Sequence, residues 1–135
     1  MIKGISHTAF VTKDMKKTLH FYIDILGFRQ FYELNDKQNN PWLIYLKIAD
    51  RQFLELFYGG IKANTFTHKR IGSDHTCYEV DDIYEIADRL EKNGIVLDAK
   101  PSQGKDLNFQ CWTKDPDGNR IEFMQMDPNS PQALS

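Results

Sequence analysis

The sequence predicts an α+β fold made of two copies of one β-α-β-β-β module. Two observations indicate it: an internal repeat of a few chemistry-bearing residues, and the same order of strand-like and helix-like segments in both halves. The length of 135 residues is ordinary for one compact unit. We therefore expect a single domain over residues 1–126, with modules at about 4–60 and 72–126 and a loose C-terminal tail at 127–135.

The repeat is sharp at two histidines and two glutamates. His7 and His75 each lie in a strand-like run and are separated by 68 positions. Glu55 and Glu122 each lie between apolar strand-forming residues and are separated by 67 positions. The remaining sequence differs between the halves, so the repeat indicates an old duplication that keeps these four side chains.

The first half begins with β-branched and aromatic residues at 5–11, which favour a strand. Apolar residues at helical spacing follow Asp14, an N-cap residue, and the helix is expected to end at Gly27. Three further strands are expected at 28–34, 42–49 and 52–58.

The second half repeats this order from a strand at 74–80. Asp82 and Glu85 form a capping-box pattern before an apolar helical stripe that ends at Gly94. A turn is expected at 115–119, where Pro, Gly and Asn suit turn geometry. The expected strands of this half are 95–99, 107–113 and 120–126.

Composition excludes several classes of function. Lys and Arg number 17 against 19 Asp and Glu, so the net charge of −2 gives no electrostatic basis for binding nucleic acid. No apolar run approaches the roughly 20 residues that span a bilayer. The N-terminal residues lack the apolar core of a signal peptide, so a cytoplasmic location is expected. Cys77 and Cys111 are expected to be buried thiols without a disulfide.

Glu55 and Glu122 are unusual because apolar residues flank both. A buried carboxylate needs a partner, although each could instead face solvent from a half-exposed strand. No basic residue recurs beside them, whereas a histidine recurs on the first strand of each module. Two imidazoles and two carboxylates suit a divalent metal such as Ni, Zn, Co, Mn or Fe and leave positions for substrate oxygens. The alternative is that His7 and His75 are core residues bonded to backbone carbonyls.

Two other histidines have no repeat partner. His20 lies on the outer face of the first expected helix, and His68 lies in the linker between the modules. We expect both at the surface.

Together, these features resemble the vicinal oxygen chelate superfamily over about residues 4–126. This superfamily includes glyoxalase I, fosfomycin- and bleomycin-resistance proteins, methylmalonyl-CoA epimerase and extradiol dioxygenases. The resemblance rests on the strand with His7, the segments 18–22 and 26–28, the strand with Glu55, His75 with the segment 80–83, and the run 115–122. The ligand order His, Glu, His, Glu is most similar to bacterial glyoxalase I.

The resemblance implies a glyoxalase-like fold, in which the modules form an incomplete mixed barrel around a cleft, and it implies a homodimer. The site would lie within one subunit or across the dimer interface. It also implies that His7, Glu55, His75 and Glu122 bind the metal. Glu122, with Glu55 as the second candidate, would remove a carbon-bound proton from a small substrate with vicinal oxygens, such as a thiol hemithioacetal, and give an enediolate. Trp42, Tyr45, Phe109 and Trp112 would line the cleft or pack in the core.

The sequence departs from glyoxalase I at two positions. That family uses an Arg and an Asn on glutathione where this chain has Val11 and Gly59, so the thiol and the true substrate stay open. A methylmalonyl-CoA epimerase-like isomerase is an alternative, although that family carries Gln where Glu55 lies. A bleomycin-resistance-type binding protein without catalysis is another. The ligand set argues against fosfomycin transferases, and an oxygenase is a minor option.

Overall fold

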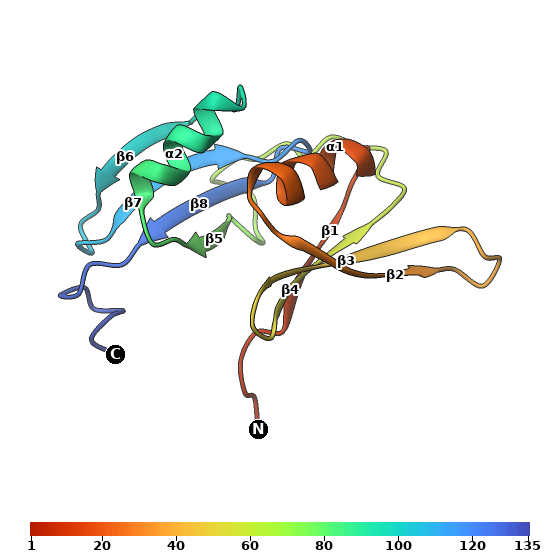
Figure 1. The fold of residues 1–135 in the computed structure, drawn as a ribbon, viewed down its shortest axis with the longest axis horizontal. Coiled ribbons are helices and arrows are strands. Elements are labelled where there is room, and N and C mark those ends of the chain that lie inside the picture. The colour runs from red at the N-terminus through yellow and green to blue at the C-terminus, as the bar shows by residue number, and fades with distance from the viewer. The chain divides into compact units, whose positions relative to one another are not determined.

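The computed structural model describes all 135 residues and divides into two compact units, Met1–Ala63 and Asn64–Ser135. Each unit has a four-stranded sheet and one helical segment (Figure 1). In both sheets one outer pair of strands is parallel and the other pairs are antiparallel. The predicted α+β class and the order β-α-β-β-β in both halves are confirmed, and each sheet is open.

The sheet of unit 1 has the strand order β1-β4-β3-β2. Its parallel pair places β1 beside β4, although these strands lie at opposite ends of the module in sequence. The strands are β1 (His7–Val11), β2 (Arg29–Asn35), β3 (Pro41–Ala49) and β4 (Gln52–Phe57).

The helical segment of unit 1 differs from the single α-helix that the sequence predicts. It starts as α1 (Met15–Leu19), capped by the Asp14 side chain, and continues as the π-helix η1 (His20–Ile25). A π-helix turns less per residue, so consecutive side chains stay closer to one face. This explains how the adjacent Phe21 and Tyr22 are both buried. Gly27 then ends the helix with a positive φ of 83°, as predicted.

Alternation along β4 separates the two faces of the first sheet. Leu54 and Leu56 are fully buried and belong to the core of unit 1, together with the buried side chains of the helix. Glu55 points to the opposite face, so the core strand positions it without placing its charge in the core.

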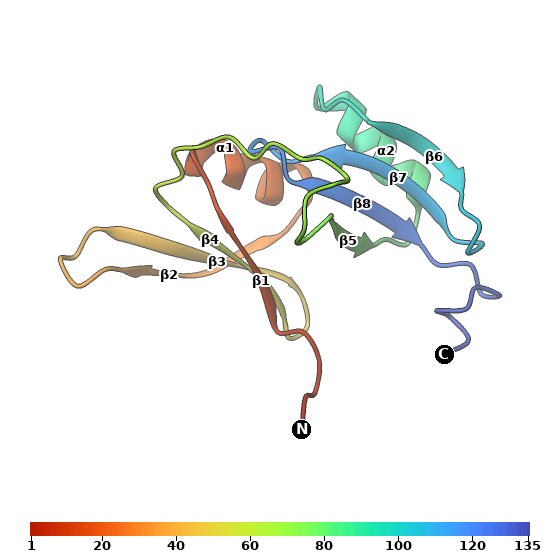
Figure 2. The same cartoon turned by 180° about the vertical axis from the view of Figure 1, so that it is seen from behind.

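The sheet of unit 2 has the order β5-β8-β7-β6. Its helix α2 (Ile83–Lys92) is capped by Asp82, whose side chain accepts hydrogen bonds from two backbone N–H groups. The helix lies in front of the sheet in Figure 1 and behind it in Figure 2, so it covers one face only. The strands are β5 (Thr76–Glu79), β6 (Ala99–Gln103), β7 (Phe109–Lys114) and β8 (Arg120–Gln125).

One predicted strand is displaced. The sequence predicts a strand at 95–99, whereas β6 begins at Ala99. The backbone N–H of Ile95 instead bonds to the carbonyl of Leu90, and Gly94 has a φ of 75°. The residues after the helix are therefore used to close its C-terminus, and the strand begins only after them.

The C-terminal tail is anchored to unit 2, so the expectation of a loose tail is wrong. Asn108 is fully buried, and its side-chain oxygen accepts from the backbone N–H of Asp127 at 3.0 Å. Its amide nitrogen donates to Asp106 and to Gln132 of the tail. Ser130 is also fully buried. A single buried amide thus ties the tail to the start of β7.

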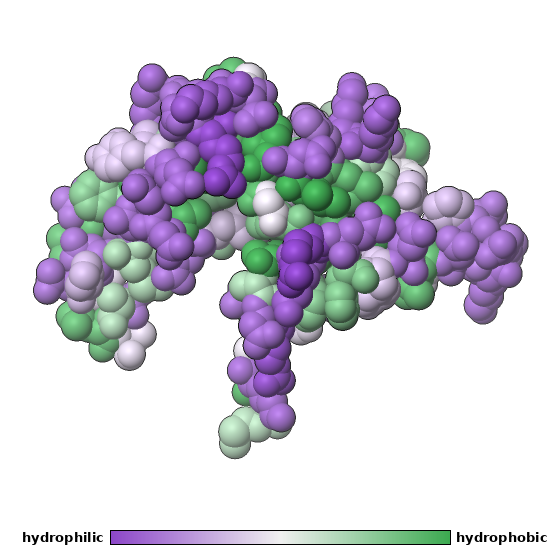
Figure 3. Space-filling model, in the orientation of Figure 1, coloured by the Kyte–Doolittle hydropathy of each residue, from purple (hydrophilic) through white to green (hydrophobic).

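Figure 3 shows hydrophilic side chains on the outer face of α2 and at the tip of the β2–β3 hairpin. None of the helices has both the length and the apolar character that crossing a bilayer requires.

Candidate metal-binding half-sites

Each unit brings together a histidine and a glutamate, and we call this pair with its neighbouring aromatic ring a half-site. The first half-site lies on the face of the unit 1 sheet that carries Glu55. In the parallel pair, Ala9 of β1 lies opposite Glu55 of β4. His7 is two residues before Ala9, so its side chain points to the same face. His7 Nε2 lies 3.6 Å from Glu55 Oε2, and the glutamate side chain is only 12% exposed. The glutamate thus lies on the face opposite the core, as expected for a half-exposed strand, but its side chain is nearly covered.

Tyr45 completes this half-site from the neighbouring strand. It lies directly opposite Glu55 in the β3–β4 pair and forms a hydrogen bond with the Glu55 side chain. Its ring meets the His7 ring edge-on at 5.6 Å and stacks on Tyr32 at 4.6 Å. Desolvation, followed by the hydrogen bond to the Glu55 carboxylate, raises the pKa of Tyr45 far above its usual range. The phenol therefore stays protonated and can donate to Glu55.

The second half-site repeats the first in unit 2. His75 directly precedes β5, and Glu122 is on the parallel strand β8. His75 Nε2 lies 3.1 Å from Glu122 Oε2, and the glutamate side chain is 10% exposed. Trp112 of β7 lies opposite Glu122, and its ring meets the His75 ring edge-on at 4.7 Å. Each module thus brings together a histidine, a glutamate and an aromatic ring.

The sequence left the roles of four aromatic residues open between cleft and core. Tyr45 and Trp112 lie beside the two glutamates, and they are 67 positions apart, as the glutamates are. That spacing was a signal that could have identified them. Phe109 lies two residues before the fully buried Cys111 on β7 and so points to the same, core face. Trp42 is half-exposed and contacts Phe57.

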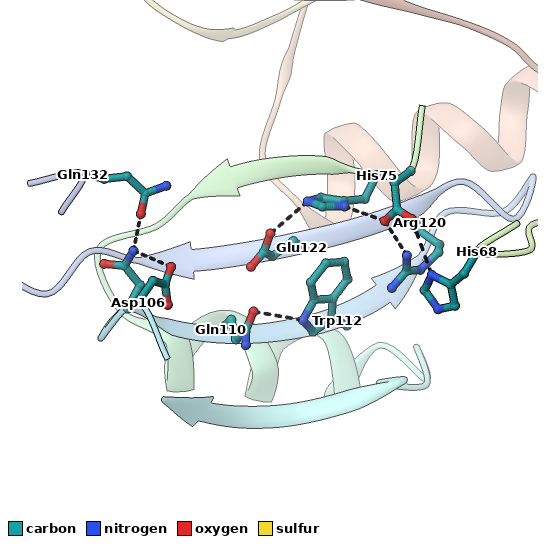
Figure 4. A network of polar contacts seen from close by, with 10 residues as sticks. His68, His75, Asp106, Gln110, Trp112, Arg120, Glu122 and Gln132 are labelled. Carbon is teal, nitrogen blue, oxygen red and sulfur yellow. Dashed lines mark hydrogen bonds and ion pairs between the residues drawn. The ribbon is translucent and has the colours of Figure 1, made fainter. Parts of the chain in front are cut away.

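His75 has a further partner that His7 lacks. Its Nδ1 lies 2.8 Å from Asp74 Oδ1, which also accepts from Arg120 at 2.6 Å (Figure 4). The Arg120 guanidinium lies between the rings of Phe66, at 4.4 Å, and Trp112, at 4.7 Å. The hydrogen bond from His75, with the nearby charge of Arg120, lowers the pKa of Asp74 below its usual range.

The other two histidines are exposed, as predicted. His20 pairs with Asp24 at 2.7 Å on the surface of the helical segment. His68 lies 3.6 Å from Asp74, at the edge of the second half-site.

One cysteine differs from the prediction. Cys111 is buried as expected, but Cys77 is exposed, because it lies opposite Glu122 on the face of the sheet that α2 does not cover. Partial desolvation, followed by the charge of Glu122, raises the pKa of Cys77 to about 12. The thiol is therefore protonated at neutral pH.

The donor atoms of each half-site suit a divalent cation. In both, an imidazole Nε2 and a carboxylate oxygen lie close together beside an aromatic ring, and this pairing of donors is common for Zn, Fe, Ni and Mn. No group of three or more His, Cys, Asp or Glu side chains gathers closely enough to hold an ion. Each unit therefore brings together two candidate ligands, whereas zinc sites use three or four protein ligands.

Comparisons with known proteins agree with the repeated modules. The family model described as Glyoxalase/Bleomycin resistance protein/Dioxygenase superfamily matches residues 4–123. A lactoylglutathione lyase of Schizosaccharomyces pombe is 27% identical over 96% of this chain, which spans only 49% of that protein. A probable lactoylglutathione lyase of Vibrio parahaemolyticus is 28% identical over 90% of this chain and 89% of its own length.

Solved structures share the fold. A glyoxalase family protein from Enterococcus faecalis superposes with a TM-score of 0.78 at 26% identity, covering 90% of this chain and 97% of its own. A lactoylglutathione lyase from Agrobacterium tumefaciens has a TM-score of 0.69 at 22% identity, covering 92% and 94%.

Proposed function

Because this chain belongs to the glyoxalase/bleomycin resistance protein/dioxygenase superfamily, we propose that it is a metal-dependent lyase or isomerase of the glyoxalase I type. The observation that carries the proposal is the duplicated pair of a histidine Nε2 and a nearly buried glutamate. Relatives named lactoylglutathione lyase support the same class of reaction.

The proposed metal ligands are His7 and Glu55 from unit 1 and His75 and Glu122 from unit 2. Each pair alone is too small a set for a catalytic ion, so we propose that two pairs share one cation, within one subunit or between two copies of the chain. A bound divalent cation would polarise the vicinal oxygens of the substrate and stabilise the negative charge that develops on them.

We propose that Glu122 is the general base. Its carboxylate is almost excluded from water and lies beside Trp112. Few water molecules would therefore compete with a bound substrate for this carboxylate. It would take the proton from the carbon next to a carbonyl and return it to the neighbouring carbon. Glu55 is the second candidate, and Tyr45, which donates to Glu55, would hold that carboxylate in one orientation.

The proposed substrate is a small molecule with two adjacent oxygens, such as the hemithioacetal of an α-ketoaldehyde and a thiol. Val11 is exposed and apolar, and Gly59 has no side chain, so neither offers the charged or amide group that glyoxalase I uses on glutathione. The experiment should therefore compare glutathione with other low-molecular-weight thiols.

We also propose that the protein is a cytoplasmic homodimer. The edge strand β2 is exposed along its whole length and carries Phe31 and Leu34, which are 58% and 45% exposed. Such an edge favours coverage by a second copy. Light scattering coupled to size exclusion would give the mass.

The test combines metal analysis with turnover. The purified protein should retain a divalent metal and convert methylglyoxal in the presence of glutathione or another low-molecular-weight thiol. Glu122→Gln should abolish turnover and leave folding intact, whereas Glu79→Gln, an exposed glutamate on β5, is the matched control. Absence of metal and turnover would favour the binding-protein alternative, and full activity of Glu122→Gln would refute the assignment of the base.

A further inference from the structure

The two half-sites have the same proposed ligands, but the residues around the histidine ring differ. The His7 ring lies beside Glu55 and the ring of Tyr45. His75 makes the corresponding contacts with Glu122 and Trp112, and in addition its Nδ1 faces Asp74. The position before His7 is Ser6, so the duplication does not account for this aspartate.

We propose that Asp74, held in place by Arg120, is a positioning residue that keeps the proton of the neutral His75 ring on Nδ1 and leaves Nε2 free beside Glu122. A neutral imidazole has one N–H and one bare nitrogen, and the hydrogen bond at one nitrogen decides the state of the other. The Asp74 carboxylate can only accept, so its hydrogen bond favours the proton at Nδ1. The bare Nε2 is then available as a ligand.

Distances favour this arrangement over its opposite. Asp74 and Glu122 compete for the single ring proton from opposite sides. The contact at Nδ1 is a hydrogen bond of 2.8 Å to Asp74, whereas Nε2 only approaches Glu122 at 3.1 Å.

Arg120 holds the Asp74 carboxylate in place, and this carboxylate in turn orients the His75 ring. Arg120 donates to the same Oδ1 that accepts from His75, which prevents this oxygen from rotating away. Its guanidinium is stacked between Phe66 and Trp112, and its side chain is only 17% exposed. Two rings and an ion pair thus restrict Arg120, and Trp112 also contacts the His75 ring. A lysine would keep the charge but lose the flat surface that stacks.

The first test needs no metal and uses the full chain. Nitrogen-15 NMR of the metal-free protein, recorded where the His75 ring is neutral, should show Nδ1 protonated. Asp74→Ala should move the proton to Nε2, because Glu122 is then the only carboxylate at the ring. The control is Asp24→Ala, which removes an aspartate of the same kind from His20, at 2.7 Å on the surface. This control should leave the His75 signals unchanged.

The second test measures affinity for zinc by competition with a chelator, and it rests on the proposed function. Loss of such an outer partner typically lowers metal affinity by about 10- to 100-fold. We expect that range for Asp74→Ala, a smaller loss for Arg120→Lys and no change for Asp24→Ala. Asp74→Asn is the conservative variant, because its amide oxygen can still accept from Nδ1, so it should keep the proton there and retain most of the zinc affinity. Should Asp74→Ala unfold, the comparison rests on the smaller loss expected for Arg120→Lys.

The two tests separate this inference from the proposed function. If the wild-type protein binds no zinc, the proposed function fails while the position of the ring proton still decides the role of Asp74. If Asp74→Ala leaves the proton on Nδ1, or shifts it without lowering the affinity of a protein that binds zinc, the positioning role is refuted.

Discussion

Sharing of one cation by two half-sites can be tested by removing one histidine at a time. Four-ligand zinc sites have apparent binding free energies of about 10–16 kcal/mol, which is about 3 kcal/mol for each ligand. If all four side chains bind one ion, His7→Ala and His75→Ala should each lower the affinity about 100-fold. The number of ions per chain should stay at one.

Independent half-sites would give a different result. The wild-type protein would bind two ions weakly, because each pair supplies only two ligands. His7→Ala would then abolish one binding event and leave the other unchanged.

Isothermal titration calorimetry with zinc reports both affinity and stoichiometry. His20→Ala is the control, since His20 is an exposed histidine outside both half-sites. Two independent binding events in the wild-type protein, with only one lost in each variant, would refute the shared cation.

Four further predictions concern stability and the thiols. Asn108→Ala removes three hydrogen bonds and should lower the unfolding free energy by about 2–3 kcal/mol. Circular dichroism should show a Tm lower by about 8 °C, and a shift below about 2 °C would contradict the anchoring of the tail. Gly60→Ala places a Cβ 2.9 Å from the backbone carbon of Thr12 and should destabilise the protein by about 1–3 kcal/mol in urea unfolding, whereas an unchanged midpoint would show that this loop gives way. Iodoacetamide should modify only Cys77 in the native protein, and the reaction should become faster as pH rises toward the Cys77 pKa of about 12. Modified Cys111 in the mass spectrum of the native protein would contradict the fold. Burial raises the pKa of Cys111 to about 11, so its contribution to stability is full below the ordinary thiol value and is lost as pH rises through about 9 to 11.

The sequence was sufficient to predict most of the fold because the strands alternate regularly. Leu54 and Leu56 are buried on either side of Glu55, so the pattern also placed this glutamate on the opposite face. The strand at 95–99 was misplaced because its first residues are apolar, whereas Ile95 is used to close the helix before it. Apolar character alone does not distinguish these two uses.

The repeat was enough to predict that each histidine lies near its glutamate. It could not predict that Asp74 and Arg120 lie beside His75. The Arg120–Asp74 contact joins residues 46 positions apart, and nothing in the first module corresponds to it. Such a pair becomes visible only when β5 is placed parallel to β8, since that pairing brings the residues just before β5 beside the start of β8.

The two modules show which features of a duplicated site tolerate change. Residues that touch the proposed ion are the same in both, and the ring opposite each glutamate stays aromatic, as Tyr45 or Trp112. Tyr45 has a hydroxyl that donates to Glu55, whereas the indole N–H of Trp112 donates to Gln110 and not to Glu122. The Trp112 ring instead stacks on Arg120, which holds His75 through Asp74. One module thus restrains its carboxylate and the other its imidazole. A carboxylate that acts as the base must move to receive a proton. Glu122 accepts from the weak thiol donor of Cys77 and not from a phenol, so this difference favours Glu122 as the base and Glu55 as the fixed ligand.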